Sequence, residues 1–439
     1  PDVVLQQCTH YQNRNDQAVP LDDEQRRRIL EANDSMTADA LRVLGVAYRI
    51  SDNLDNDNDG EFLDDGLEEN LIFVGLIGMI DPARPEVPPA LDIARTAGIR
   101  TVMITGDYPN TARAIAQDIG LLGERHGVLT GQELDLLDDA ALQEAVRHTD
   151  VFARVSPQHK MRVVQALRAN GEVVAMTGDG VNDAPSIKQA DIGVAMGITG
   201  TDVTKETADM VLTDDNYASI VSAVEQGRVI YSNIRKFVYY LLSCNLAEIA
   251  IIFLATLMGL PSPLTAIQLL WLNLITDGAP ALALGVERGD PDIMDRPPRP
   301  PSEPIINRRM KIGIIVQTVA ITAVTLTAYL IGLNQYPGNQ ELAESMAFVA
   351  LSFSELLRAF TARSEVYPIL KIGLFTNRSM NWAVLSSMVL LLAVIYVPFL
   401  QPVFDTAPLT WAQWQYLLPL LFVPAFAAEV TKWYLARRS

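Results

Sequence analysis

Six long apolar segments fill the second half of the sequence, and they restrict the possible folds more than any other feature. They cover residues 237–258, 264–284, 312–332, 344–362, 380–400 and 412–434. As a helix, each is about long enough to cross a hydrocarbon core of roughly 30 Å. Hydrophobic residues make up 49% of the 439 positions, which is too many for an ordinary soluble enzyme. We therefore expect an all-α membrane domain of six transmembrane helices, with the lipid bilayer as a partner.

Basic residues lie in alternate connections between these segments. Arginine and lysine occur between the second and third segments, between the fourth and fifth, and after the sixth, whereas the other three loops have none. Because basic loops stay in the cytosol, both ends of this chain and its first half are expected there. The net charge of −18 is carried mainly by the first half and argues against a nucleic-acid partner.

A short motif in the first half predicts a phosphate and magnesium site. Residues 173–176 are apolar and indicate a buried strand, which runs into a turn where glycine permits a close approach to a ligand. Asp179 and Asp183 are four residues apart, with Asn182 between them. A helical turn after Gly180 would let the three oxygen-bearing side chains converge on one hard cation and its phosphate.

Strand and helix patterns alternate around this motif. They predict strands at 71–80, 100–104, 151–153 and 173–176, and helices at 87–97, 110–119, 138–147 and 157–169. Such alternation is typical of a parallel α/β domain, in which phosphate ligands bind beyond the carboxyl ends of the strands. Nearer the start of the chain, we expect helices at 22–33 and 37–44 and a strand at 43–48.

Further candidate catalytic residues follow a strand end or begin a helix. Thr105, Gly106 and Asp107 come directly after the strand at 100–104. The threonine hydroxyl can hydrogen-bond a transferring phosphoryl group, and the glycine leaves room for it. Lys160, on the first turn of its helix, can neutralise the charge that develops on the phosphoryl oxygens.

The sequence Thr-Gly-Asp-Gly-Val-Asn-Asp-Ala-Pro at 177–185 resembles the hinge motif of P-type ATPases, which are cation pumps phosphorylated on an aspartate. The segment from Thr105, Lys160 and residues 179–183 resemble three motifs of the haloacid-dehalogenase-like phosphotransferases. The resemblance implies an α/β Rossmannoid phosphorylation domain that uses ATP and Mg²⁺, with Asp179 as a magnesium ligand. The sequence contains no Asp-Lys-Thr-Gly-Thr segment for the phosphorylated aspartate, so we expect this domain to be incomplete and the upstream part of the same pump to be a partner. A structural turn in another α/β protein is the alternative.

The same resemblance implies domain boundaries and nucleotide contacts. Residues 1–75 would be the end of a nucleotide-binding domain, 76–215 the second part of the phosphorylation domain, and 216–439 a stalk helix and the membrane domain. Arg42, Asp107 and Arg154 would lie near ATP, although a purely structural role for either arginine is the alternative.

An acidic segment later in the N-terminal region resembles half of a calcium-binding loop. Residues 55–62 have the carboxylates and glycine of an EF-hand, but its twelfth position is Gly66 instead of glutamate. We therefore favour a solvated acidic linker over a calcium loop.

Polar residues inside the apolar segments predict a cation site, because an ionisable side chain at membrane depth is costly and normally faces a partner or a pathway. They are Asn245 and Glu248 in the first segment, Asn273, Thr276 and Asp277 in the second, and Glu355 in the fourth. Within each of the first two segments, these residues share one helix face. The sequence from Asp277 to Pro280 predicts an unwound break that lines a cavity. These hard oxygens suit calcium, although sodium or manganese could use many of them.

Residues 243–248, 268–278 and 292–299 resemble the calcium pumps of the sarcoplasmic-reticulum kind. By that resemblance, one complete cation site is formed by Asn245, Glu248, Thr276, Asp277 and Glu355, and half of a second by Asn273 with Asp277. The implied function is ATP-driven export of calcium from the cytosol across the plasma membrane. A sodium or manganese pump, a cation-binding fragment without turnover, and a channel or transporter fused to a phosphatase-like domain are the alternatives.

Two further residue types bear on this site. Arg358 follows Glu355 by one helical turn and could either pair with it and weaken it as a ligand, or extend to the cytosolic face. Cys8 and Cys244 lie in separate halves and lack a metal-binding spacing. We therefore expect neither a disulfide nor a functional role for either cysteine.

Overall fold

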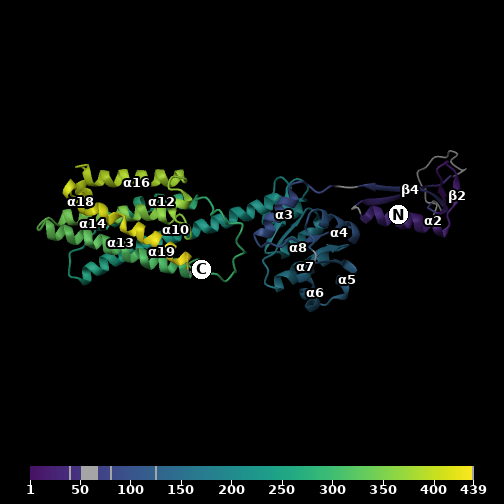
Figure 1. Cartoon of the computed structure of the whole chain (residues 1–439), viewed down its shortest axis with the longest axis horizontal. Helices are drawn as coiled ribbons and strands as arrows, with labels where there is room; N and C mark the ends of the chain where they lie inside the picture. The colour runs from purple at the N-terminus through teal and green to yellow at the C-terminus, as the bar shows by residue number, and fades with distance from the viewer. Residues whose placement is uncertain (39–40, 51–67, 80–81, 124–125, 438–439) are drawn as a thin grey trace. The chain divides into compact units, whose positions relative to one another are not determined.

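The computed structural model describes residues 1–38, 41–50, 68–79, 82–123 and 126–437, which divide into two compact units, Pro1–Ser222 and Ala223–Ser439 (Figure 1). The acidic segment at 55–66 lies outside the described residues.

The first unit begins with a small mixed sheet. Its strands are β1 (Cys8–Gln12), β2 (Ala18–Pro20), β3 (Arg42–Tyr48) and β4 (Leu71–Met79) in the order β2-β1-β4-β3, accompanied by α1 (Asp2–Gln6) and α2 (Asp23–Ala38). The predicted helix at 37–44 is wrong, because Arg42 already pairs with Met79 in the antiparallel β3–β4 ladder. Val43 is buried and Leu44 is exposed, which is the alternation of a strand.

The rest of this unit is a parallel α/β fold, as expected. Three strands, β5 (Met103–Ile104), β6 (Gly127–Thr130) and β7 (Thr149–Ala153), form a sheet of order β5-β7-β6, and β8 (Ala175–Gly178), β9 (Ile192–Met196) and β10 (Met210–Leu212) form a second of order β10-β9-β8. The helices are α3 (Val87–Thr96), α4 (Pro109–Asp118), α5 (Gly131–Leu136), α6 (Asp139–Ala145), α7 (Pro157–Ala169), α8 (Ala184–Gln189) and α9 (Asp202–Thr207).

Several details of this fold differ from the sequence-based expectation. β5 begins at Met103 instead of residue 100, and β9 and β10 were not expected. β8 begins at Ala175, two residues late, because the Val174 N–H bonds the Asp191 carboxylate and Val173 is exposed. β6 was not expected, since its short sequence at 127–130 carries little strand signal.

β5 and β8 are both end strands of their sheets among the described residues. They nevertheless border one hydrophobic cluster, in which Ile104 of β5 packs against Met176 of β8 and Val164 of α7. Thr105 and Asp179 therefore follow the ends of two strands that border the same hydrophobic cluster.

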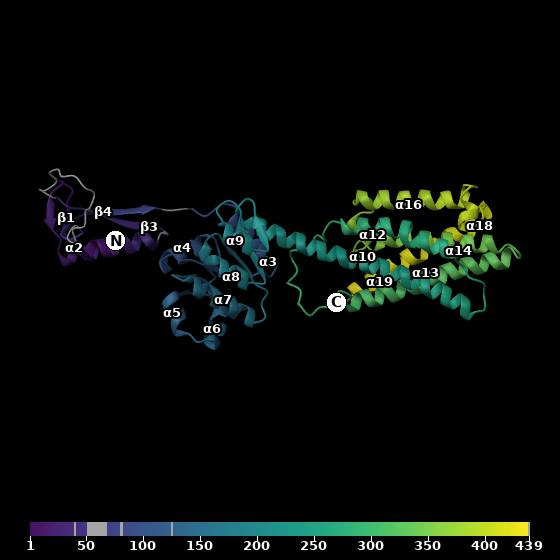
Figure 2. The ribbon, with the colours of Figure 1, turned by 180° about the vertical axis from the view of Figure 1, so that it is seen from behind.

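The second unit is a helical bundle (Figure 2). Its main helices are α10 (Tyr217–Leu257, which starts in the first unit), α11 (Ala266–Trp271), α12 (Gly278–Gly285), α13 (Arg308–Gln335), α14 (Gln340–Thr361), α16 (Arg378–Tyr396), α18 (Trp411–Leu421) and α19 (Val423–Ala436), with the short α15 (Ile369–Ile372) and α17 (Gln401–Phe404) between them. α13 packs along α14 and α19. In both views these helices lie side by side.

Within the described residues, four helices are long and apolar enough to cross a membrane: Tyr217–Leu257, Ala266–Gly285, Arg308–Gln335 and Arg378–Tyr396. α14 has the length but carries several ionisable residues. α18 and α19 are separated at Phe422, where Pro424 cannot donate a hydrogen bond to the preceding turn.

The predicted break after Asp277 takes a different form. Residues Leu272–Thr276 form a π-helical turn between α11 and α12, and the Asp277 N–H donates to the Leu272 carbonyl at 2.9 Å. The helix is therefore wider at this point, with one extra residue in its turn, but its backbone stays helical. The Ile275 carbonyl would pair in the π pattern with the nitrogen of Pro280, which has no hydrogen; it accepts from the Ser387 hydroxyl of α16 at 3.0 Å instead.

Candidate phosphate and cation sites

Lys160 and Asp183 form the centre of the first candidate site. Ser156 caps the N-terminus of α7, which fixes the first turn that carries Lys160. The Lys160 ammonium lies 2.6 Å from Asp183 Oδ1, and Asp183 Oδ2 accepts from the Gly180 N–H at 3.2 Å. A side chain at Gly178 would clash with the Asp183 carboxylate, so the motif needs glycine there. The ion pair therefore holds the Lys160 ammonium beside the end of β8.

Thr105 and Asp107 form a local turn at the end of β5. The Thr105 hydroxyl donates to Asp107 Oδ2 at 3.0 Å and accepts from the Asp107 N–H at 3.1 Å. The neighbouring Arg154 N–H donates to the Asp107 carbonyl at 3.1 Å. Arg154 has a positive φ of 54°, and its guanidinium lies over the Tyr108 ring at 3.8 Å. The structure therefore brings Asp107 and Arg154 together at one sheet edge.

Asp179 and Asn182 remain exposed beside this cluster. The Asp179 carbonyl accepts from the Thr201 N–H at 3.0 Å, whereas its carboxylate makes no hydrogen bond to the protein in the described ranges. A free carboxylate and an amide oxygen at a strand end are the hard donors that Mg²⁺ prefers, so these residues fit that ion. Asp183, by contrast, is already held by Lys160.

Asp215 organises the loop that follows β9. Its carboxylate accepts from the N–H groups of Gly197, Ile198 and Thr199 at 2.6 to 2.9 Å, and from the Thr199 hydroxyl at 2.8 Å. Burial opposes ionisation of Asp215, but these donors outweigh it and lower its pKa to about 2. The carboxylate is therefore ionised at neutral pH and locks the loop next to the first site.

The second candidate site lies inside the helical unit and centres on Asp277. The π turn and α12 meet at this residue, which is fully buried. Asp277 Oδ1 accepts from the Tyr240 hydroxyl of α10 at 2.7 Å. Asp277 Oδ2 and the hydroxyl of the preceding Thr276 have no hydrogen-bond partner within the described part of the chain. Two oxygens in this buried space are therefore available to a ligand.

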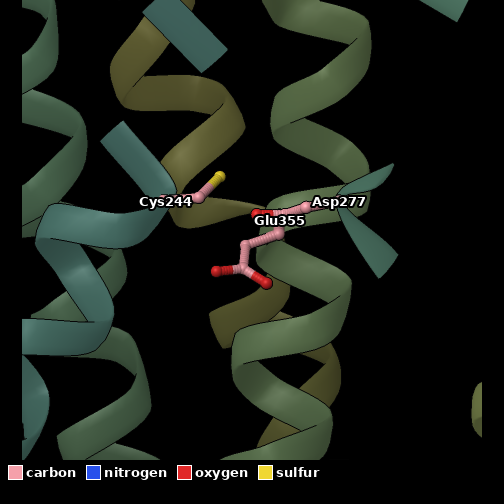
Figure 3. A group of neighbouring side chains, drawn as sticks. All are labelled: Cys244, Asp277 and Glu355. Carbon is pink, nitrogen blue, oxygen red and sulfur yellow. The ribbon is translucent and has the colours of Figure 1, made fainter. Parts of the chain in front are cut away.

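Glu355 of α14 and Cys244 of α10 complete a buried cluster with Asp277. The Cys244 sulfur and one carboxylate oxygen from each acid all lie within 4.8 Å of one another. Figure 3 shows the three side chains close together, each from a different part of the bundle. Both Glu355 oxygens lack a partner among the residues described. The two acids are the predicted ligands, whereas the thiol is a residue that sequence reasoning missed.

Glu248 and Asn273 form a second contact between the predicted ligands. The Asn273 amide donates to the two Glu248 oxygens at 3.0 and 3.3 Å, which joins α10 to the π turn. Asn245 differs, because its amide donates to the Leu241 carbonyl of its own helix at 2.8 Å. The structure thus pairs Glu248 with Asn273 and Asp277 with Glu355, and records no side-chain bond from Asn245 to the other candidates in the ranges described.

Arg358 does not pair with Glu355 in the part of the chain that the structure describes. Its guanidinium donates to the Thr361 hydroxyl at 3.1 Å and lies 4.2 Å from the centre of the Tyr239 ring. The side chain is fully buried, and Thr361 is the last residue of α14, so the guanidinium lies at the C-terminal end of its own helix. The expected pairing with Glu355 is therefore not observed, and Glu355 keeps both oxygens open.

Arg42 is the one predicted site residue whose side chain lies outside what the structure describes. Its backbone begins β3.

A parallel α/β unit with an aspartate–lysine cluster, joined to apolar helices with buried carboxylates, is the combination found in cation-pumping ATPases. Family models agree. The model described as "Cation transporting ATPase, C-terminus" matches residues 261–434, "P-type ATPase, cytoplasmic domain N" matches 1–86, and "haloacid dehalogenase-like hydrolase" matches 160–224. Over these three stretches the chain is similar to P-type ATPases.

Its relatives narrow this class to pumps named for calcium. The "Calcium-transporting ATPase 1" of Bacillus cereus is 46% identical over 98% of this chain and 49% of its own length. The "Calcium-transporting ATPase" of Bacillus subtilis is 44% identical over 97% and 47%. The human "Calcium-transporting ATPase type 2C member 1" is 40% identical over 98% and 45%. The chain spans about half the length of the curated relatives it matches.

Proposed function

We propose that this chain is the C-terminal part of an ATP-driven pump that exports calcium from the cytosol. The observation that carries the proposal is the set of unpartnered, fully buried oxygens on Asp277, Glu355 and Thr276. A buried carboxylate without a partner is costly unless something binds it. A dehydrated divalent cation supplies the missing interactions, and calcium takes six to eight such oxygens.

The remaining predicted ligands belong to the same proposed site. Glu248 and Asn273, already in contact, would supply further oxygens, and Asn245 would join after a rotation of its amide. Asn273 and Asp277 would also contribute half of a second cation site. A sodium or manganese pump is the second candidate, because these ions accept many of the same oxygen ligands.

The phosphate site supports the ATP-driven part of the proposal. Lys160 would neutralise charge on the transferred phosphoryl group, and Thr105 would hydrogen-bond it once released from Asp107. Asp179, with Asn182 and Asp183 beside it, would hold Mg²⁺, which supplies charge neutralisation at the phosphate. Arg42, Asp107 and Arg154 would contact ATP. Gly106 would leave room for the phosphate.

The nucleophilic aspartate of the whole pump would come from a segment outside this chain. β5 and β8 are both end strands in the described residues, and they border one hydrophobic cluster. We infer that a parallel strand carrying the aspartate pairs between them and delivers it beside Lys160. The incomplete phosphorylation domain at 76–215 and the nucleotide-domain remnant at 1–75 are part of this proposal.

The proposed membrane domain has two spans in addition to the four helices that are long and apolar enough to cross a membrane. We propose that α14 is a further span whose ionisable residues face the site, and that α18 with α19 is the last. Six spans place both ends of residues 216–439 on the same side, which the basic loops assign to the cytosol of a plasma-membrane protein. α10, continuous from Tyr217 to Leu257, would transmit movement because it carries Glu248 and is anchored by the Tyr217–Thr101 hydrogen bond of 2.7 Å.

Transport by the full-length protein tests this function. Vesicles containing it are expected to accumulate radioactive calcium when ATP is added, and Glu355→Gln is expected to abolish the uptake. Competition between calcium, manganese and sodium for ATPase activation identifies the ion. Uptake of manganese or sodium with no response to calcium would contradict the assignment.

A further inference from the structure

Cys244 lies where a second kind of ligand atom can reach the proposed cation site. Its side chain is fully buried on α10, one helical turn from Tyr240 and Glu248. The sulfur lies within 4.8 Å of an oxygen of Asp277 and an oxygen of Glu355 (Figure 3). One thiol and two carboxylates from three segments therefore lie in a single buried cluster.

A structural role alone does not account for this group. A free cysteine is often only a small buried apolar residue, and Cys244 does pack near Leu284 and Leu356. The adjoining acids are different, because both Glu355 oxygens and Asp277 Oδ2 lack a partner among the described residues. These unpartnered oxygens are buried in the same cluster as the sulfur, which indicates a ligand.

The donor set has a chemical preference of its own. Carboxylate oxygens suit calcium, whereas thiolates favour softer cations such as zinc, and cadmium shares that softness. We propose that Cys244 makes this site bind thiophilic divalent cations, of which Cd²⁺ is the probe, in competition with calcium. This inference rests on the proposed function only where it places calcium and the thiophilic cation at the same site.

The binding step balances without an oxidant. The thiol loses its proton, the sulfur forms a bond to the incoming cation, and the proton leaves to solvent. The carboxylates of Asp277 and Glu355 complete the coordination as anions. The Tyr240 hydroxyl continues to donate to Asp277 Oδ1, which holds that carboxylate in place.

The test measures equilibrium binding of radioactive calcium to the purified full-length protein while Cd²⁺ is titrated. The variant is Cys244→Ser, which exchanges the sulfur for a hydroxyl. Cys8→Ser is the matched control, because Cys8 is also buried but lies in the core of the N-terminal sheet. We expect the ratio of Cd²⁺ affinity to Ca²⁺ affinity to fall at least about tenfold in Cys244→Ser and to stay unchanged in Cys8→Ser.

A second measurement keeps the inference independent of calcium and of the serine variant's folding. In wild-type protein, Cd²⁺ is expected to produce an ultraviolet cadmium–thiolate band, and the Cys8→Ser variant should keep that band. An absent band together with an unchanged affinity ratio would overturn the inference. If the protein binds no calcium but Cd²⁺ still produces the band, the proposed calcium function fails and this inference stands.

Discussion

Two buried acids in the helical unit have opposite surroundings. Glu287 accepts from Arg363 Nε at 2.7 Å, from a second Arg363 nitrogen at 3.0 Å, and from the Asn377 amide at 2.8 Å. Arg363 uses its other donors on the Gly373 and Leu374 carbonyls. Glu355 is as deeply buried, yet neither of its oxygens has a partner in the described part of the chain.

This difference separates a structural acid from a functional one. Glu287 and Arg363 join the ends of α12 and α14 to the start of α16, and their charges are satisfied within the protein. Buried polar groups are normally satisfied in this way. Glu355 and Asp277 depart from the rule, and unsatisfied groups of this kind cluster where a ligand binds.

The unsatisfied side of the comparison is broken most directly by Asp277→Asn in the full-length protein. Calcium affinity should fall roughly tenfold or more, because ligand charge sets the affinity of such sites. Thermal stability without calcium should not fall, since the change removes an unpaired buried charge. Equilibrium calcium binding and the unfolding temperature in detergent measure the two effects. Glu341→Gln, at an exposed position of α14, is the control. A stability loss with calcium binding intact would reverse the comparison.

The satisfied pair should respond in the opposite way. Arg363→Met leaves Glu287 buried without its charged partner, so the free energy of unfolding should fall by about 3–5 kcal/mol. Adding Glu287→Gln should restore part of that loss. Thermal unfolding in detergent measures both, with exposed Arg308→Met as the matched control. An unchanged unfolding temperature in Arg363→Met would show that the pair is not structural.

Lys160 tests whether a paired group can also be functional. Lys160→Met leaves Asp183 without the ammonium at 2.6 Å and removes a charge from the proposed phosphate site. Phosphorylation of the full-length protein by labelled ATP should slow by about 10²-fold, the usual cost of losing one such group. Lys188→Met on α8 is the control, because Lys188 is exposed on the neighbouring helix. Normal phosphorylation in Lys160→Met would limit this pair to a structural role.

The smallest effect concerns the acid side of stability. The pKa of Asp215 in the folded protein is about 2, below its ordinary value of 3.8, so its ionised form stabilises the fold. That contribution is complete above pH 3.8 and is lost as the pH falls toward 2. The stability difference between wild type and Asp215→Asn should therefore narrow across this interval. Unfolding temperatures measured against pH provide the test, and a constant difference would contradict it.

Sequence reasoning located most of the candidate residues because their chemistry is unusual for their surroundings. Asp277 and Glu355 are recognisable as carboxylates in apolar segments, and the parallel strands follow from alternating patterns. The contacts that join distant segments were not predictable. Arg363 and Glu287 are 76 residues apart, and Cys244 reaches the acids only through the bundle's packing. The π turn was mistaken for an unwound break, because Gly278 and Pro280 interrupt either structure.

The hydrogen bond from Ser387 to the Ile275 carbonyl has a consequence for how the second span can move. A π turn contains one residue more than an α-helical turn. If the extra residue shifts along the helix, the segment that it passes rotates by about 100° relative to the rest of the helix. Here the Ile275 carbonyl, within the π turn, accepts a hydrogen bond of 3.0 Å from Ser387 of α16. Sliding α16 would release it, so the direction in which Asp277 faces can be set from outside its own helix.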